Sequence, residues 1–150
     1  MKKVINVLLI CTGNSARSIL GEALFNHLGA GRVRAFSAGS KPTGKVNPLA
    51  LETLQNHGIR LADARSKAWD EFSVPDAPKM DFIFTVCDNA ANEPCPIWPG
   101  RPATAHWGIP DPSRAEPVEA RRKAFEEAFN QLEARVRVFL EQPPELEAEE

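Results

Sequence analysis

Short apolar runs alternate with helix-like segments along this chain of 150 residues, and this alternation limits the possible folds more than any other feature. Residues 4–10 and 82–86 are β-branched and almost wholly apolar, which is typical of strands buried on both faces of a parallel sheet. Residues 33–37 predict a further strand, and residues 103–106 predict a weaker one. We therefore expect a three-layer α/β fold, with helices on both faces of a parallel sheet.

Four segments between and after these strands predict helices. Residues 16–28 and 117–140 place apolar side chains at helical spacing, and residues 48–57 end just before a glycine. Residues 66–72 predict a short helix. Residues 87–114 are rich in Pro, Gly, Asn and Asp, which indicates loops around the weak strand.

Length, charge and cysteine usage limit the class of protein. We expect a single catalytic domain over residues 1–142, followed by an acidic tail, residues 143–150, whose composition predicts disorder. A formal net charge of −2 gives no general attraction to nucleic acid or to an anionic membrane, and no apolar run is long enough to span a bilayer. The three cysteines are an odd number without the spacing of a secreted disulfide framework. We therefore expect a monomeric, cytoplasmic protein in a reducing compartment.

The segment that joins the first strand to the first helix predicts an oxyanion site. Successive backbone N–H groups at the start of a helix form a concave anion site. The oxyanion-binding residues that we expect are Thr12, Gly13, Asn14, Ser15, Ala16, Arg17 and Ser18. Gly13 allows close backbone approach, Asn14 tolerates left-handed backbone, and the fork of Arg17 matches two oxygens of a tetrahedral anion.

Cys11 begins this segment and is the candidate nucleophile. The dipoles that bind an anion also stabilise a thiolate, so we expect the pKa of Cys11 to fall to about 3.5–7.5, with Ser18 donating a hydrogen bond to its sulfur. The structural alternative is a buried thiol at a strand end. Cys87 and Asp111 also follow strands, and ligands of parallel α/β folds bind beyond the carboxyl ends of strands. We therefore expect Cys11, Cys87 and Asp111 to meet in one site.

The pattern Cys-x5-Arg-Ser after the first strand, together with Asp111-Pro112, resembles the low-molecular-weight protein tyrosine phosphatases and the arsenate reductases built on the same fold. The resemblance implies four parallel strands in the order 2-1-3-4, with Asp111 as general acid. The segment from Cys87 to Cys95 resembles the redox segment of thioredoxin-linked arsenate reductases. It implies arsenic detoxification, in which Cys11 attacks arsenate and Cys87 and Cys95 complete a disulfide relay.

Other functions stay open at this point. A phosphatase of this family hydrolyses a cysteinyl phosphate and usually carries an aromatic residue after the Asp-Pro pair, whereas here Ser113-Arg114 follows. A non-catalytic oxyanion-binding module would not need Cys11. A zinc site from Cys87, Cys95 and His106 lacks the short ligand spacing of such sites, so we expect no metal.

We expect arsenate as the substrate, with phosphate or sulfate able to occupy its place. No bound cofactor is expected, and the reductant is external: thioredoxin, or glutathione with glutaredoxin. Some reductases of the family bind potassium beside the oxyanion loop, through residues that resemble Asn14, Glu22 and Ser37. Here Lys67 aligns with the Asp that completes that set, so we expect its ammonium group to take the place of the ion.

Overall fold

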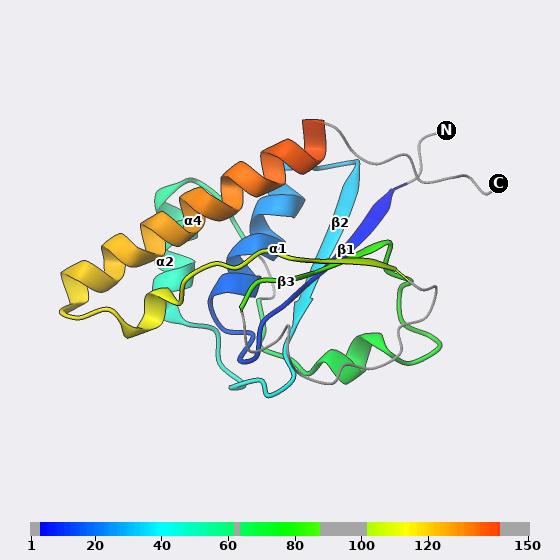
Figure 1. The fold of residues 1–150 in the computed structure, drawn as a ribbon, viewed down its shortest axis with the longest axis horizontal. Helices are drawn as coiled ribbons and strands as arrows, with labels where there is room; N and C mark the ends of the chain where they lie inside the picture. The colour runs from blue at the N-terminus through cyan, green and yellow to red at the C-terminus, as the bar shows by residue number, and fades with distance from the viewer. Residues whose placement is uncertain (1–3, 62–63, 88–101, 142–150) are drawn as a thin grey trace.

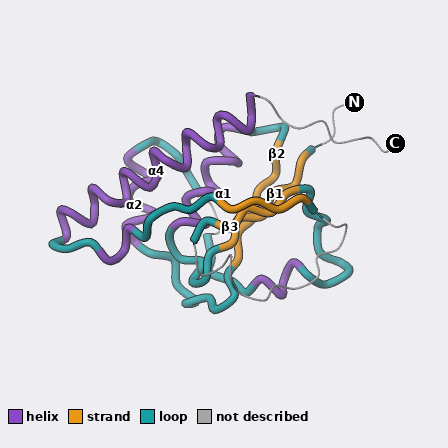
Figure 2. The backbone as a smooth tube through the Cα atoms, in the orientation of Figure 1, coloured by secondary structure: helices purple, strands orange, loops and turns teal. Residues whose placement is uncertain are grey.

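The computed structural model describes residues 4–61, 64–87 and 102–141. Its centre is a parallel sheet in the order β2-β1-β3-β4 (Figures 1 and 2). The strands are β1 (Ile5–Ile10), β2 (Val33–Ala38), β3 (Phe82–Thr85) and β4 (Ala103–His106). This confirms the predicted fold class and strand order.

The apolar run of residues 4–10 becomes an inner strand of the sheet. β1 pairs with β2 from Ile5↔Val33 onwards and with β3 from Val7↔Phe82 onwards. The last four residues of β1 are buried. A strand with neighbours on both sides and layers on both faces has no exposed side, which explains why β1 is apolar rather than alternating.

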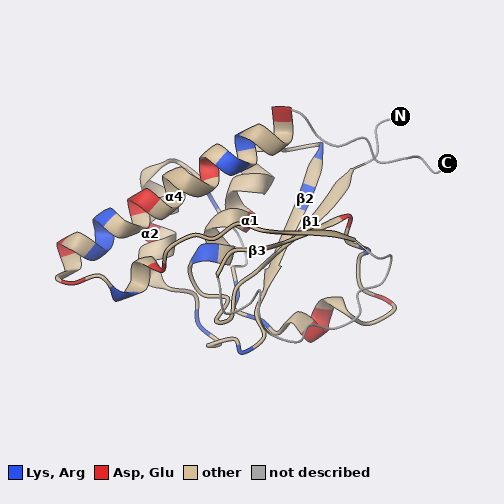
Figure 3. Ribbon diagram, in the orientation of Figure 1, with Lys and Arg blue, Asp and Glu red and all other residues tan. Residues whose placement is uncertain are grey.

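One face of the sheet is covered by long helices. α1 (Arg17–Leu28) packs against α4 (Val118–Glu141), and α2 (Pro48–Asn56) contacts both. Phe25 of α1 stacks on Phe84 of β3 with ring centroids 6.0 Å apart, which places aromatic core between the helices and the sheet. Basic and acidic residues are interspersed along α4, and neither sign dominates (Figure 3).

The opposite face is covered by the 3-10 helix η1 (Trp69–Phe72). In β2, Val33 faces the helical layer, because it lies beside Gly29 at the end of α1. Successive strand residues point to opposite faces, so Phe36, three residues after Val33, points to the face away from α1. The ring of Phe36 packs on that of Phe72, with centroids 5.5 Å apart.

The predicted helix over residues 66–72 is shorter than expected. Its first three residues are not helical, because Ala68 forms a parallel bridge with Gly39 after β2. Among the described residues, no helix is both long and apolar enough to cross a bilayer. The acidic tail, residues 143–150, lies outside the described ranges.

Candidate active site

The loop between β1 and α1, residues 11–16, is organised around a buried asparagine. Asn14 is fully buried and has a φ of 45°, the left-handed conformation that its residue type tolerates. Its Nδ2 donates to Ser18 Oγ at 2.8 Å, and its Oδ1 accepts from the N–H of Lys67 at 2.8 Å. Asn14 therefore ties the loop to α1 and to the segment before η1. The contact expected between Ser18 and the Cys11 sulfur stays a prediction.

The carbonyl oxygens of the loop point outward to the segments that surround it. The N–H groups of Lys41, Thr43 and Asn47 and the hydroxyl of Ser66 donate to the carbonyls of Thr12, Gly13 and Ser15 at 2.8–3.1 Å. The N–H and C=O of one trans peptide point to opposite sides, so the N–H groups that follow these carbonyls face the interior of the loop. The N–H of Gly13 indeed contacts the Cys11 thiol. The result is a nest of donors suited to an oxyanion.

Gly39, which follows β2, packs closely against the main chain of the loop. A Cβ added to Gly39 would lie 2.4 Å from the carbonyl oxygen of Thr12 and 2.6 Å from that of Cys11. The N–H of Gly39 donates to the carbonyl of Lys67, and its carbonyl accepts from the N–H of Trp69, both at 2.9 Å. The loop thus rests directly on the main chain that leaves β2.

Two buried thiols share this site. Cys11 and Cys87 are both unbridged and expose only 5% and 4% of their surface. The N–H of Thr12 donates to Cys87 Sγ at 3.2 Å, and Thr12 Oγ1 lies 3.6 Å from the same sulfur. A hydrogen bond also joins the two thiols. The ends of β1 and β3 therefore bring Cys11 and Cys87 together, as the topology predicted.

The predicted fall in the pKa of Cys11 is wrong. The hydrogen bond with Cys87 and the burial of the thiol raise the pKa of Cys11 above its ordinary value. The charge of Arg17 and the N–H of Gly13 act in the opposite direction but do not outweigh these effects. The dipoles of the loop alone predict a low pKa, whereas the second sulfur comes from a distant strand and leaves no local signal in the sequence.

Arg17, the first residue of α1, turns its guanidinium toward the loop after β4. Its Nη1 donates to the carbonyl of Ile109 at 2.8 Å, and its Nη2 lies 3.7 Å from Asp111 Oδ2. Together with Cys87 and Arg114, these residues line a hollow with a volume of about 520 Å³. The hollow therefore joins a thiol, a carboxylate and two guanidinium groups at the carboxyl edge of the sheet.

Asp111 precedes the 3-10 helix η2 (Pro112–Arg114) and caps it. Burial alone would raise the pKa of Asp111, but two hydrogen bonds from Ser113 and the charges of Arg17 and Arg114 hold it below its usual value. Asp111 is therefore a carboxylate at neutral pH. A general acid must carry a proton, so the expected role requires an anion beside it that raises its pKa.

A buried lysine lies behind the loop. Lys67 Nζ donates to the carbonyl of Arg65 at 3.0 Å and to Ser37 Oγ at 3.4 Å, and it lies 3.9 Å from Glu22 Oε1. Ser37 Oγ in turn donates to Glu22. The ammonium group occupies the place among Glu22, Ser37 and the Asn14 segment that the resemblance would give to potassium. The residues present therefore do not fit a bound potassium ion.

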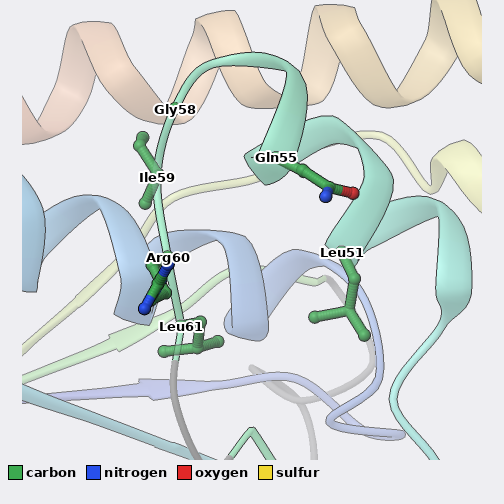
Figure 4. A pocket seen from close by; sticks show the side chains of 6 residues that line it. All are labelled: Leu51, Gln55, Gly58, Ile59, Arg60 and Leu61. Atoms are coloured by element: carbon green, nitrogen blue, oxygen red, sulfur yellow. The ribbon is translucent and has the colours of Figure 1, made fainter.

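The remaining predicted residues and the other hollows add no second candidate active site within the described ranges. Cys95 lies outside the described residues. Within the described ranges, no group of three or more His, Cys, Asp or Glu side chains is placed to hold a metal. A second hollow, between α2 and residues 58–61, is lined by side chains such as Leu51, Gln55 and Leu61 and contains no thiol (Figure 4). It does not compete with the loop as a candidate active site.

Two contacts of the site were not predicted from the sequence. Arg114 Nε lies 3.4 Å from Asp111 Oδ2, and its spacing of three residues from Asp111 is the only sequence signal for that pair. The contact between Thr12 and Cys87 joins two strand ends, and a single sequence gives no sign of it.

Comparison with known proteins agrees with this geometry. Residues 6–149 match the family described as low molecular weight phosphotyrosine protein phosphatase. An arsenate reductase of Shouchella clausii is 34% identical over 141 residues, which cover 93% of this chain and 96% of that protein.

Two solved structures extend the comparison. A thioredoxin-dependent arsenate reductase of Corynebacterium glutamicum is 26% identical with a TM-score of 0.68; the match covers 93% of this chain but 61% of that structure. An arsenate reductase of Archaeoglobus fulgidus is 28% identical with a TM-score of 0.64, and the match covers 87% of this chain and 98% of that one.

Proposed function

The chain belongs to the low molecular weight phosphotyrosine protein phosphatase family, and within that family we propose that it reduces arsenate to arsenite with thioredoxin as electron donor. The observation that carries this proposal is the second thiol. Cys87 Sγ is held by Thr12 beside the nucleophile Cys11. Hydrolysis of a phosphate ester needs one thiol, whereas reduction of an oxyanion needs a second sulfur that supplies electrons.

In the proposed reaction, the Cys11 thiolate displaces one oxygen of arsenate, which leaves as water, and forms a sulfur–arsenic bond. The donors of the loop and the fork of Arg17 hold the remaining oxygens. Asp111 provides the proton for the departing oxygen. The raised pKa of Cys11 must fall for this step, and transfer of its proton to the bound anion supplies the thiolate.

The second step transfers two electrons. The thiolate of Cys87 attacks Cys11 Sγ, a Cys11–Cys87 disulfide forms, and the sulfur–arsenic bond breaks with its electron pair on arsenic, which leaves as arsenite. Cys95 then attacks Cys87 and releases Cys11 as a thiol. The Cys87–Cys95 disulfide is reduced by the dithiol of thioredoxin, which restores the starting state.

The test is consumption of NADPH by thioredoxin reductase and thioredoxin in the presence of the protein and arsenate. We expect turnover that stops when arsenate or thioredoxin is omitted. A parallel assay with p-nitrophenyl phosphate measures phosphatase activity. Turnover of the ester without any arsenate-dependent NADPH consumption would replace the proposal with a phosphatase function. Turnover supported only by glutathione and glutaredoxin would keep the reaction but change the donor.

A further inference from the structure

The carboxylate of Asp111 lies between two guanidinium groups that come from different elements. Its Oδ2 is 3.7 Å from Nη2 of Arg17 in α1 and 3.4 Å from Nε of Arg114 in η2. Its Oδ1 accepts from both the N–H and the hydroxyl of Ser113, at 2.9 and 2.7 Å. Ser113 therefore anchors one oxygen, while the other is shared between the two arginines.

Arg17 is the arginine that a bound oxyanion needs. In this structure its guanidinium faces a carboxylate, which offers the same kind of charged oxygen as a tetrahedral anion. An incoming oxyanion must therefore compete with Asp111 for Arg17. The carboxylate, left without Arg17 beside a second negative charge, then needs another cation until it takes up the proton that its expected role as general acid requires.

We propose that Arg114 is a positioning residue that takes over the carboxylate of Asp111 when an oxyanion binds, and thereby frees Arg17 for the anion. The proposal rests on the proposed function insofar as arsenate is that anion. Arg114 suits this task because its side chain is 88% exposed and can follow the carboxylate, whereas that of Arg17 is 15% exposed and bonded to Ile109.

The effect of Arg114 on binding has a bounded size. Water and salt screen exposed ion pairs. Loss of the ion pair between Arg114 and Asp111 should therefore change the dissociation constant for the anion about two- to fivefold, and less at high salt. Arg114 also lines the hollow with Arg17 and Cys87, so a direct attraction for the anion is the competing explanation. The two explanations differ in whether the effect of Arg114 depends on the charge of Asp111.

The experiment is a double-mutant cycle on the binding of inorganic phosphate, measured by titration calorimetry with the reduced protein. We expect Arg114→Gln to weaken phosphate binding about two- to fivefold. Asp111→Asn should strengthen it, because the competitor for Arg17 is gone. When Asp111→Asn is already present, adding Arg114→Gln should have no further effect. Equal weakening by Arg114→Gln in both backgrounds, or no weakening in either, would overturn the proposal.

Arg122→Gln is the matched control. Arg122 forms an ion pair with Glu52 between α4 and α2, is also exposed, and carries the same charge. Phosphate binding should not change in this variant; a loss equal to that of Arg114→Gln would assign the effect to net charge and overturn the proposal. Melting temperatures of all variants check the fold.

Phosphate binding involves no electron transfer, so this cycle is independent of the NADPH assay. A cycle that shows the expected dependence in a protein that does not reduce arsenate upholds the role of Arg114 and overturns only the proposed function. Arsenate turnover together with additive effects overturns only the role of Arg114.

Discussion

The N–H of Thr12 donates to Cys87 Sγ at 3.2 Å, across 75 residues of sequence. The first peptide N–H after Cys11 is therefore bonded to the second sulfur. A thiolate at Cys87 gains this donor and the nearby Thr12 hydroxyl, 3.6 Å away. The same sulfur, together with burial, raises the pKa of Cys11 above its ordinary value.

Cys11→Ser should abolish arsenate-dependent NADPH consumption, because a hydroxyl at neutral pH is a far weaker nucleophile than a thiolate. Phosphate should still bind the variant, since the loop donors and Arg17 are unchanged. The coupled assay measures NADPH consumption, and titration calorimetry measures phosphate binding. Turnover near the wild-type level would remove the nucleophile from the proposal.

Arg17→Lys should lose most activity while the fold is kept. An ammonium group cannot reproduce the two parallel donors of the guanidinium. The loss should appear both in phosphate affinity and in arsenate turnover. A variant that binds phosphate as tightly as wild type would show that the fork is not used for the anion.

Asp111→Asn should slow formation of the arsenic adduct by about 10²–10⁴-fold, the usual contribution of a general acid. Burial raises the pKa of Asp111, but the hydrogen bonds from Ser113 and the charges of Arg17 and Arg114 lower it further than burial raises it. The protonated form of Asp111 therefore becomes scarcer as pH rises above that pKa. The single-turnover rate of wild type should fall with rising pH more steeply than that of the variant. Stopped-flow measurements over a pH series check this, and identical profiles would contradict it.

The lowered pKa of Asp111 also makes the stability of the protein depend on pH. Because the folded pKa of Asp111 is depressed, its contribution to stability is present above the unfolded pKa and is lost as pH falls through the folded value. Asp111→Asn should therefore flatten the loss of melting temperature at strongly acidic pH. The change should be small, because the side chain is 31% exposed.

The order of the disulfide relay can be read from trapped intermediates. Cys95→Ser should accumulate a Cys11–Cys87 disulfide after one turnover, and Cys87→Ser should stall with no disulfide. Mass spectrometry of alkylated protein distinguishes these states. A double variant of Cys87 and Cys95 that reduces arsenate at the wild-type rate with thioredoxin would disprove the relay.

Lys67 should make the protein indifferent to potassium. Its ammonium group already occupies the cluster with Glu22 and Ser37, so melting temperature and activity should be the same in potassium and sodium at equal ionic strength. A stabilisation specific to potassium would contradict this prediction.

Burial raises the pKa of Glu22 and lowers that of Lys67, so the ionised form of each is the costly one. Lys67→Met leaves Glu22 without its cation and should lower the free energy of unfolding by about 3–5 kcal/mol. Adding Glu22→Gln should recover much of that loss. Denaturation of both variants tests this, and equal losses would contradict it.

The sequence allowed the sheet to be predicted because its signals are local. The apolar run of residues 4–10 and the helical spacing of residues 16–28 correspond to β1 and α1, and the loop between them was recognised from Cys11 to Arg17. The predicted placement of Lys67 among Glu22 and Ser37 depended on resemblance, and the contacts agree with it.

The errors arose where distant segments decide the outcome. Residues 66–68 are not helical because Ala68 pairs with Gly39, although their composition allows a helix. The pKa of Cys11 depends on the Cys87 sulfur, which comes from a distant strand. Propensity and loop dipoles act over a few residues and cannot include such contacts.

The contact between Gly39 and the loop has a consequence for directed evolution. With carbonyl oxygens 2.4 and 2.6 Å from the place of a Cβ, even alanine would push the main chain of Thr12 and Cys11 out of position. A library that encodes every amino acid at residue 39, selected for growth of a host on arsenate, should return glycine alone. Engineering of this scaffold toward other oxyanions must therefore begin elsewhere in the site.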